Sequence, residues 1–288
     1  MAMVNSDRGG GERVKGDLHC HSFYSDGSAS VDQVVRFAMA EGLDFISLTD
    51  HDTMAGVERA VNLGKRLGIR VVPGLEVSTV DGETGRNVHL ICYMPKRLDN
   101  LEKFVQKTLD SRNEAARPLV EEIGKVFPIT WKDVVEAAGP AKCIFRQHIM
   151  RALMERGYSF EIFGDFYQEV FSRIPYSVQF PEVREAVEVI RAAGGIAAMA
   201  HPSAYSSLGL AEELARDGKI QAIELSHPRN TDEDKKEIAR IAMEYGLVPI
   251  GGSDYHGFYT SHPHPLGTCT TPGESLDALL KVREQLNK

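Results

Sequence analysis

A short apolar segment that leads into two alternate histidines constrains this chain more than any other feature. Residues 14–20 have the pattern of a mostly buried strand, and side chains alternate between the two faces of a strand. His19 and His21 therefore project on the same side, close enough together to bind one cation. Asp26 follows in the next turn, where its carboxylate can bind a second metal ion.

Comparable histidines and acids recur at the ends of apolar, β-rich segments throughout the chain. Alternating histidines also occur on ordinary half-buried strands. The recurrence of histidines and acids at the ends of several other segments, however, favours a functional site. Imidazole and carboxylate ligands without thiolate suit zinc, manganese or iron, and their number fits two or three divalent ions. Close-set ions of this kind activate a shared water for attack on a phosphoryl group. The candidate metal ligands are His19, His21, Asp26, His51, Glu76, His89, His201, Asp254 and His256.

The hydrophobic pattern alternates between strand and helix over 13–97 and again over 182–288. Such alternation predicts an α/β fold with parallel strands and outer helices, and in barrels of this kind the catalytic groups lie at the carboxyl ends of the strands. We expect Pro73 and Gly74 to turn the chain after a strand over 69–72. The predicted strands are 14–20, 43–49, 69–72, 87–94, 196–200, 222–226 and 248–251, and the predicted helices are 31–41, 55–67, 183–193, 208–217, 232–245 and 275–286.

Residues 98–181 interrupt this alternation with a pattern that is almost wholly helical. We therefore predict a barrel domain over 13–97 and 182–288, with a helical insert or cap domain over 98–181. Residues 1–12 contain three consecutive glycines and no apolar block, and they are expected to form a flexible leader.

Charge and composition limit the class of partner. The formal net charge of -8 argues against a broad basic surface for long nucleic acid, although it permits a small anionic substrate. No apolar segment approaches membrane-spanning length, and a soluble cytoplasmic protein is expected. The four cysteines are far apart in sequence and predict neither a disulfide framework nor a structural zinc site. The oligomeric state stays open.

Five motifs, taken in order, resemble those of the PHP family, named for polymerase and histidinol phosphatase. They are His19-Cys20-His21 with Ser25-Asp26-Gly27, Thr49-Asp50-His51-Asp52, Gly74-Leu75-Glu76, Ala200-His201-Pro202 and Gly252-Ser253-Asp254-Tyr255-His256. The resemblance implies a distorted (β/α)7 barrel with a trinuclear metal centre. It also implies three ligand groups: His19, His21, Glu76 and Asp254; Glu76, His89 and His201; and Asp26, His51 and His256.

Within the predicted insert, Arg146-Gln147-His148 resembles the Arg-Pro-His helix of one branch of that family, with Gln147 where the motif usually has proline. That branch hydrolyses nucleoside 3',5'-bisphosphates and related short 5'-phosphorylated oligonucleotides. The resemblance implies that Arg146 clamps a phosphate and that His148 adds a donor. The alternative is that both are solvated surface residues.

Other polar residues lie near the candidate ligands in sequence. His227 and Arg229 follow a strand end and are candidates for substrate contact, with an ordinary loop as the alternative. Asp17, Asp50 and Asp52 adjoin candidate ligands, and we expect them to orient imidazoles by hydrogen bonds.

The sequence therefore predicts a metal-dependent phosphoesterase acting on small nucleotides. The preferred substrate class is nucleoside 3',5'-bisphosphate, whose 3'-phosphate would be removed by a metal-bridging hydroxide without a protein nucleophile. Three alternatives stay open: a 5'-3' exonuclease on short 5'-phosphorylated RNA, a histidinol-phosphate phosphatase, and a non-catalytic metal-binding module.

Overall fold

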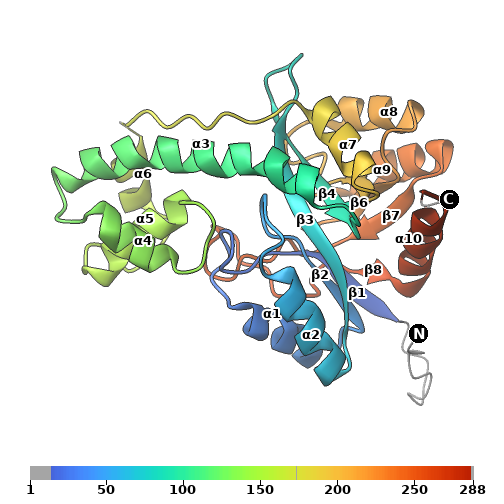
Figure 1. Ribbon diagram of the computed structural model, residues 1–288, viewed down its shortest axis with the longest axis horizontal. Coiled ribbons are helices and arrows are strands. Elements are labelled where there is room, and N and C mark those ends of the chain that lie inside the picture. Colours follow the sequence, from blue (N-terminus) through green and yellow to red (C-terminus); the bar gives the residue numbers. More distant parts are fainter. Residues whose placement is uncertain (1–13, 173, 287–288) are drawn as a thin grey trace.

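The computed structural model describes residues 14–286 apart from residue 173, so the predicted leader over 1–12 lies outside the described residues. Its centre is one eight-stranded sheet in the order β7-β6-β5-β4-β3-β2-β1-β8 (Figure 1). The strands are β1 (Lys15–Cys20), β2 (Phe45–Leu48), β3 (Arg70–Val80), β4 (Asn87–Tyr93), β5 (Ile196–Met199), β6 (Ala222–Ser226), β7 (Val248–Gly251) and β8 (Thr271–Pro272).

The two ends of the sheet meet, so that it nearly closes into a barrel. The amide of His21, just after β1, donates to the carbonyl of Tyr255, just after β7, at 2.8 Å, and Cys20 forms a parallel bridge with Tyr255. The short strand β8 pairs antiparallel with the start of β1, on the same edge as Tyr255 and opposite β2. The α/β barrel class predicted from the sequence is thus confirmed, with one strand more than the seven that were expected.

The strand β3 differs from the prediction. Pro73 and Gly74 do not turn the chain, because Pro73 still pairs with Leu48 of β2 while its carbonyl accepts from Met94 at 2.8 Å. The strand runs on to Val80 and pairs antiparallel with β4, and β4 pairs antiparallel with β5. The expectation of parallel strands throughout is therefore wrong on both sides of β4.

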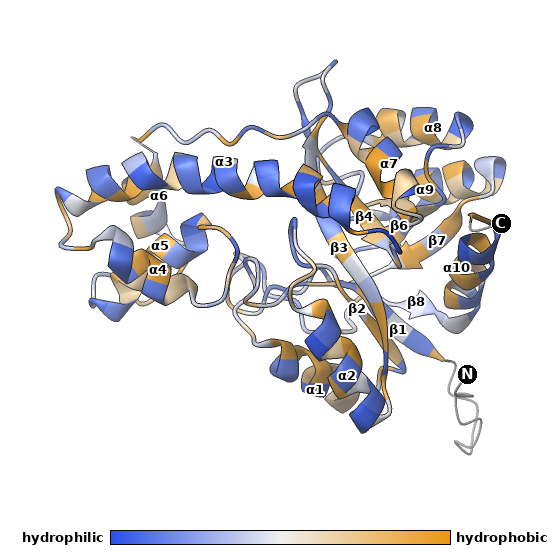
Figure 2. Cartoon of the chain, viewed as in Figure 1, coloured by the Kyte–Doolittle hydropathy of each residue, from blue (hydrophilic) through white to orange (hydrophobic). Residues whose placement is uncertain are grey.

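Six helices pack outside the barrel, close to the predicted ranges. They are α1 (Val31–Ala40), α2 (Val57–Leu67), α7 (Val183–Ala192), α8 (Leu208–Arg216), α9 (Asp232–Tyr245) and α10 (Gly273–Leu286). Ser30 caps α1 through a capping box with Gln33, and Gly68 ends α2 in the left-handed conformation, with φ of 81°. Figure 2 shows the hydrophobic residues concentrated on the strands and on parts of the surrounding helices.

The stretch from 98 to 181 holds four helices and, in its described residues, no strand: α3 (Asp99–Gly124), α4 (Trp131–Ala138), α5 (Arg146–Glu155) and α6 (Asp165–Phe171). Leu101 and Phe104 of α3 belong to a core cluster with α7 and β4. Farther along α3, Leu119 and Ile123 pack in a second cluster with α4, α5 and α6. The long helix α3 therefore links the barrel to the smaller helices (Figure 1).

The barrel is filled behind its polar end. Val72 on β3 has the same side-chain orientation as Glu76, and Ile91 on β4 has the same orientation as His89, because side chains alternate along a strand. Both apolar residues belong to one buried cluster that also includes Ala198 of β5. This packing fixes the strands whose far ends carry the candidate ligands.

Candidate metal centre

The carboxylate of Glu76 on β3 is surrounded by imidazoles. Glu76 is fully buried. Its Oε1 lies 2.9 Å from both His89 Nδ1 and His201 Nε2. Its Oε2 lies 3.1 Å from His19 Nε2, 3.2 Å from His21 Nε2 and 3.2 Å from His51 Nδ1. Both carboxylate oxygens thus face ring nitrogens of five histidines, which come from four segments of the fold: the end of β1, the segment after β2, β4 and the segment after β5.

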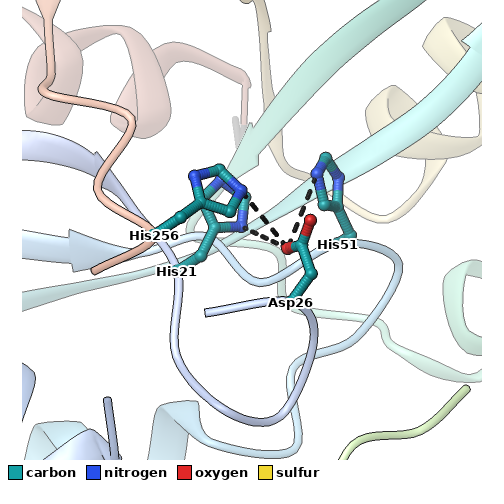
Figure 3. A group of neighbouring side chains, drawn as sticks. All are labelled: His21, Asp26, His51 and His256. Carbon is teal, nitrogen blue, oxygen red and sulfur yellow. Dashed lines mark ion pairs between the residues drawn. The ribbon is translucent and has the colours of Figure 1, made fainter. Parts of the chain in front are cut away.

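A second group of side chains gathers around Asp26 (Figure 3). The Oδ1 atom of Asp26 lies 3.3 Å from His256 Nε2 and 3.9 Å from both His21 Nδ1 and His51 Nε2. His21 and His51 therefore contact both the Glu76 and the Asp26 carboxylates, through different ring nitrogens.

Asp254 completes the cluster. Its Oδ1 lies 3.5 Å from His19 Nε2, 3.3 Å from His21 Nε2 and 3.5 Å from His256 Nδ1. All nine predicted ligands are thus part of one connected arrangement. Three sets of ligand atoms that lie within 4.8 Å of one another are His19, His21, Glu76 and Asp254; His51, Glu76 and His89; and His21, Asp26, His51 and His256.

The first of these sets is the one that the family resemblance implies, and the other two differ by one residue. His51 takes the place of His201 in the second set, and His21 joins the third. Because His51 and His21 each offer two ring nitrogens, one imidazole can belong to neighbouring sets.

Several atoms of this cluster are buried and have no hydrogen-bond partner. Among the described residues they include His19 Nε2, both ring nitrogens of His21, Asp26 Oδ1, His51 Nδ1 and Glu76 Oε2. Buried polar atoms are normally satisfied, and each exception needs an explanation. Imidazole and carboxylate atoms that converge without partners fit divalent cations, because the ion supplies the missing interaction.

Burial and neighbouring charges have opposite effects on the pKa values of the side chains in this cluster. Burial acts to lower the pKa of His21, but the neighbouring carboxylates of Asp254 and Glu76 raise it to about 10. Burial prevails at His51 and His89, whose imidazole pKa values are lowered. At Asp26 burial is outweighed by the nearby imidazoles, and its pKa is lowered. Protons and metal ions therefore compete for the same nitrogens.

A cavity of about 270 Å³, here called the metal-centre cavity, opens onto this cluster. Seven of the nine candidate ligands line it, together with Gln147, Phe163, Tyr205, Arg229, Tyr259, Thr260 and Ser261. The tyrosine ring of Tyr205 lies 5.0 Å from the His89 ring and 5.5 Å from the His201 ring, centroid to centroid.

Three acids expected to orient imidazoles do something else. Asp17 accepts hydrogen bonds from the amides of His19, Ser253 and Gly267 and from the Ser253 hydroxyl. Asp50 accepts from Ser22 and Ser25, and Asp52 accepts from the Ser78 amide at 2.9 Å. In the described structure these three carboxylates thus bind backbone amides and hydroxyls of the segments that carry the ligands. The ligand rings themselves point toward Glu76, Asp26 and Asp254.

The acid that does contact a candidate ligand ring from behind is Glu224, which the sequence reading missed. It is fully buried on β6, its Oε1 lies 3.1 Å from His19 Nδ1, and its Oε2 accepts from the His201 amide at 2.8 Å. A proton on His19 Nδ1 leaves Nε2 free to face Glu76 and Asp254. The available signal was a carboxylate in the middle of a strand predicted to be buried, which requires a partner.

Backbone strain is concentrated at this centre. Asp52, His201 and Asp254 have φ values of 56°, 24° and 51°, and residues other than glycine rarely adopt such positive values. Gly252 avoids a different conflict, since a Cβ there would collide with His19. The two ligand-bearing segments can therefore approach closely only with glycine at this position.

The predicted substrate-binding residues differ in their position relative to the metal-centre cavity. Arg229 lines the metal-centre cavity, and His227 lies beside it, with Nε2 3.4 Å from Asp254 Oδ2. The Arg146 guanidinium lies over the rings of Tyr176 and Phe171, at 4.6 and 5.4 Å, and its Nε has no hydrogen-bond partner.

His148 departs from the prediction. It is buried, does not line the metal-centre cavity, and accepts the Phe145 amide on Nδ1 at 3.2 Å. Its ring thus satisfies a free amide at the start of α5, as a capping-box side chain does, because its position in the first turn points it back at the preceding residue.

Comparisons with known proteins agree on one family. Residues 17–192, more than half of the chain, match the model of the PHP domain. The chain is 34% identical to phosphoribosyl 1,2-cyclic phosphate 1,2-diphosphodiesterase of Eggerthella lenta, over 86% of this chain and 96% of that protein. It is 30% identical to a 5'-3' exoribonuclease of Haemophilus influenzae, with coverage of 84% and 90%.

Two further similarities point the same way. The 3',5'-nucleoside bisphosphate phosphatase of Chromobacterium violaceum is 29% identical, over 83% of this chain and 86% of that protein. A crystal structure from Bifidobacterium adolescentis, described as a metal-dependent phosphoesterase, superposes with a TM-score of 0.82 at 27% identity, covering 93% of this chain and 95% of that one. No helix in the described residues is long and apolar enough to cross a membrane. The barrel, the clustered imidazoles and carboxylates, and these similarities together show that the chain belongs to the PHP family of metal-dependent phosphoesterases.

Proposed function

We propose that the chain removes the 3'-phosphate from nucleoside 3',5'-bisphosphates. The observation that carries the proposal is Glu76, whose carboxylate faces five imidazoles in a buried cluster with unpartnered ligand atoms. Such a cluster concentrates positive charge once ions are bound, which suits a substrate with two phosphates. The bisphosphate phosphatase from Chromobacterium violaceum supports this substrate class.

In this proposal the centre would hold two or three divalent ions, manganese, zinc or iron, and Glu76 would be a ligand of two of them. His19, His21, Glu76 and Asp254 would hold one ion, Glu76, His89 and His201 another, and Asp26, His51 and His256 a third. When bound, such ions neutralise phosphoryl charge and lower the pKa of water, so that hydrolysis needs no protein nucleophile.

The chain's own residues would position the ligands and the substrate. Glu224 fixes the orientation of His19 through the 3.1 Å contact with its Nδ1. Arg229 on the cavity wall supplies positive charge for a phosphate, and we propose His227 as a neighbouring substrate contact. Arg146 is proposed to clamp the second phosphate, since its guanidinium lies over two aromatic rings and its Nε is unpartnered.

A second candidate is diester cleavage, either of a phosphoribosyl 1,2-cyclic phosphate or at the 5' end of short RNA. The 34% and 30% identities to relatives with those names favour it. The same metal cluster could serve a monoester or a diester, so the identity of the substrate must be tested directly.

The test measures product release from a matched set of substrates with manganese-loaded enzyme and a chelator-treated control. The set holds adenosine 3',5'-bisphosphate, adenosine 5'-monophosphate, phosphoribosyl 1,2-cyclic phosphate, a 5'-phosphorylated trinucleotide and histidinol phosphate. The proposal predicts the highest kcat/KM for the bisphosphate. A higher value for the cyclic phosphate or the trinucleotide would replace it with the second candidate, and a preference for histidinol phosphate would overturn both.

A further inference from the structure

A large cleft adjoins the metal-centre cavity and has no role in the proposal so far. The cleft, here called the aromatic cleft, has a volume of about 1040 Å³ and lies between α5, the segment 160–164 and the loop 258–263. Phe163, Tyr259, Thr260 and Ser261 line both it and the metal-centre cavity. The two spaces therefore adjoin one another along these four residues.

The volumes of the two spaces suggest different occupants. Pockets that bind small organic ligands usually measure about 300–1,000 Å³, and much of the 270 Å³ of the metal-centre cavity is needed for ions and a phosphoryl group. The aromatic cleft is large enough for a nucleoside. A substrate whose phosphate reaches the ions would thus leave the rest of its structure in the cleft.

Two exposed phenylalanines mark the cleft. Phe160 is 96% exposed and Phe258 is 82% exposed, the highest values for aromatic side chains among the described residues. Burial of such exposed rings is favourable, either against one another or by stacking on a flat ligand. A nucleobase is a suitable ligand, because every base has a flat face that stacks on aromatic side chains.

Phe258 is held in place beside the metal centre. It follows the candidate ligand His256 by two residues, and its amide donates to the Ser28 hydroxyl at 2.8 Å, while the Ser28 amide donates to the His256 carbonyl at 3.0 Å. The position of the ring is therefore tied to that of the metal ligand. A fixed separation of this kind suits recognition of a base at a set distance from the reacting phosphate.

The charges in the cleft favour an uncharged group over a second phosphate. Arg151 pairs with Glu155 at 2.9 Å and contacts the Tyr259 hydroxyl at 3.2 Å, so its charge is already compensated. The remaining charged lining residue, Glu161, is acidic. In the proposal, phosphate binding is thus left to Arg229, Arg146 and the metal centre, which lie outside the residues that only the cleft contributes.

We infer that the aromatic cleft binds the nucleobase of the substrate by stacking on Phe160 and Phe258, and so selects substrates that carry a base over base-free ribose phosphates. This inference rests on the proposed function and adds the origin of its specificity. It also distinguishes this chain from an enzyme whose substrate is a phosphoribosyl cyclic phosphate without a base.

The experiment compares adenosine 3',5'-bisphosphate with the abasic analogue, in which hydrogen replaces the base. Wild type, the double variant Phe160→Ala/Phe258→Ala and the control Phe37→Ala are assayed with manganese. Phe37 is also an exposed phenylalanine, but it lies on α1, away from the cleft. We expect the ratio of kcat/KM for the two substrates to favour the nucleotide and to fall about tenfold in the double variant, chiefly through KM.

The possible results distinguish failure of the nucleobase-binding inference from failure of the proposed function. Efficient hydrolysis of both bisphosphates by wild type at equal kcat/KM would overturn the inference and leave the proposed function intact. A preference for the base that survives in the double variant, or falls equally in Phe37→Ala, would also overturn it. Failure of wild type to hydrolyse either bisphosphate would overturn the proposed function and the inference together.

Discussion

The Glu224 carboxylate lies 3.1 Å from Nδ1 of His19, and both side chains are completely buried. The two residues are separated by 205 positions in the sequence, and the contact joins β6 to β1 across the barrel. It fixes the ring of a candidate ligand from the side opposite Glu76. Carboxylates that hold a metal-binding histidine in this way raise its basicity and set its tautomer.

Replacing Glu224 by glutamine should therefore weaken metal binding while the fold is kept. The neutral amide no longer favours the His19 orientation that presents Nε2, and a loss of metal affinity on the order of 10- to 100-fold is expected. Titration of the metal-free protein with manganese measures this. Glu188→Gln is the matched control, because Glu188 pairs with Lys219 on the surface. Equal affinities for the two variants would contradict the role of Glu224.

Arg112 of α3 should be important for stability. It donates to Ser78 Oγ at 2.9 Å, lies 3.7 Å from Asp52 and stacks on Phe145 at 4.6 Å, and it is buried. Arg112→Ala leaves the buried Asp52 carboxylate without its cation, which typically costs about 3 kcal/mol or more. Urea unfolding should show this loss.

The control for Arg112 is on the same helix. Arg117 is exposed and stacks on Trp131 at 4.3 Å, so Arg117→Ala should change the free energy of unfolding by less than about 1 kcal/mol. Arg112→Lys should recover only part of the loss, since a lysine cannot reproduce the planar stacking. Full recovery by lysine would show that the rings contribute little.

His148 should make the stability of the protein depend on pH. Burial lowers its pKa to about 4, whereas an exposed histidine titrates near 6.5. As the pH falls below 6.5, the unfolded chain takes up a proton that the folded chain refuses, so stability decreases until about pH 4. At pH 5 this single group accounts for at most about 2 kcal/mol.

The variant His148→Gln isolates that contribution, because glutamine does not titrate and can still accept the Phe145 amide. The free energy of unfolding of chelator-treated wild type and variant would be measured at pH 7 and pH 5. The decrease between these values should be about 2 kcal/mol smaller in the variant. Equal decreases would mean that His148 does not stay neutral in the fold.

The sequence predicted the parts of the site that depend on local geometry. The alternation of side chains along 14–20 placed His19 and His21 on one face, and the apolar segments before His51, His201 and Asp254 placed them at strand ends. These features follow from periodicities of two and of about 3.6 residues, and the helices and most strands agree with the structure to within a few residues.

Long-range pairing was harder to predict. The periodicity of β4 is the same whether its neighbours run parallel or antiparallel, so the antiparallel pairing with β3 and β5 had no local signal. The two residues of β8 are too few for a pattern. The hydrogen bonds of Asp17 reach Ser253 and Gly267, more than 200 residues away, and such partners depend on the closure of the barrel.

The central claim is that the cluster around Glu76 binds the ions on which phosphoester hydrolysis depends. Its most direct test measures metal content and phosphate release on the same preparations of wild type, Glu76→Gln and Glu188→Gln, with circular dichroism to check the fold. The account predicts two or three ions per chain and metal-dependent turnover in wild type and Glu188→Gln, with loss of both properties in a folded Glu76→Gln. Undiminished metal content and turnover in Glu76→Gln would contradict it.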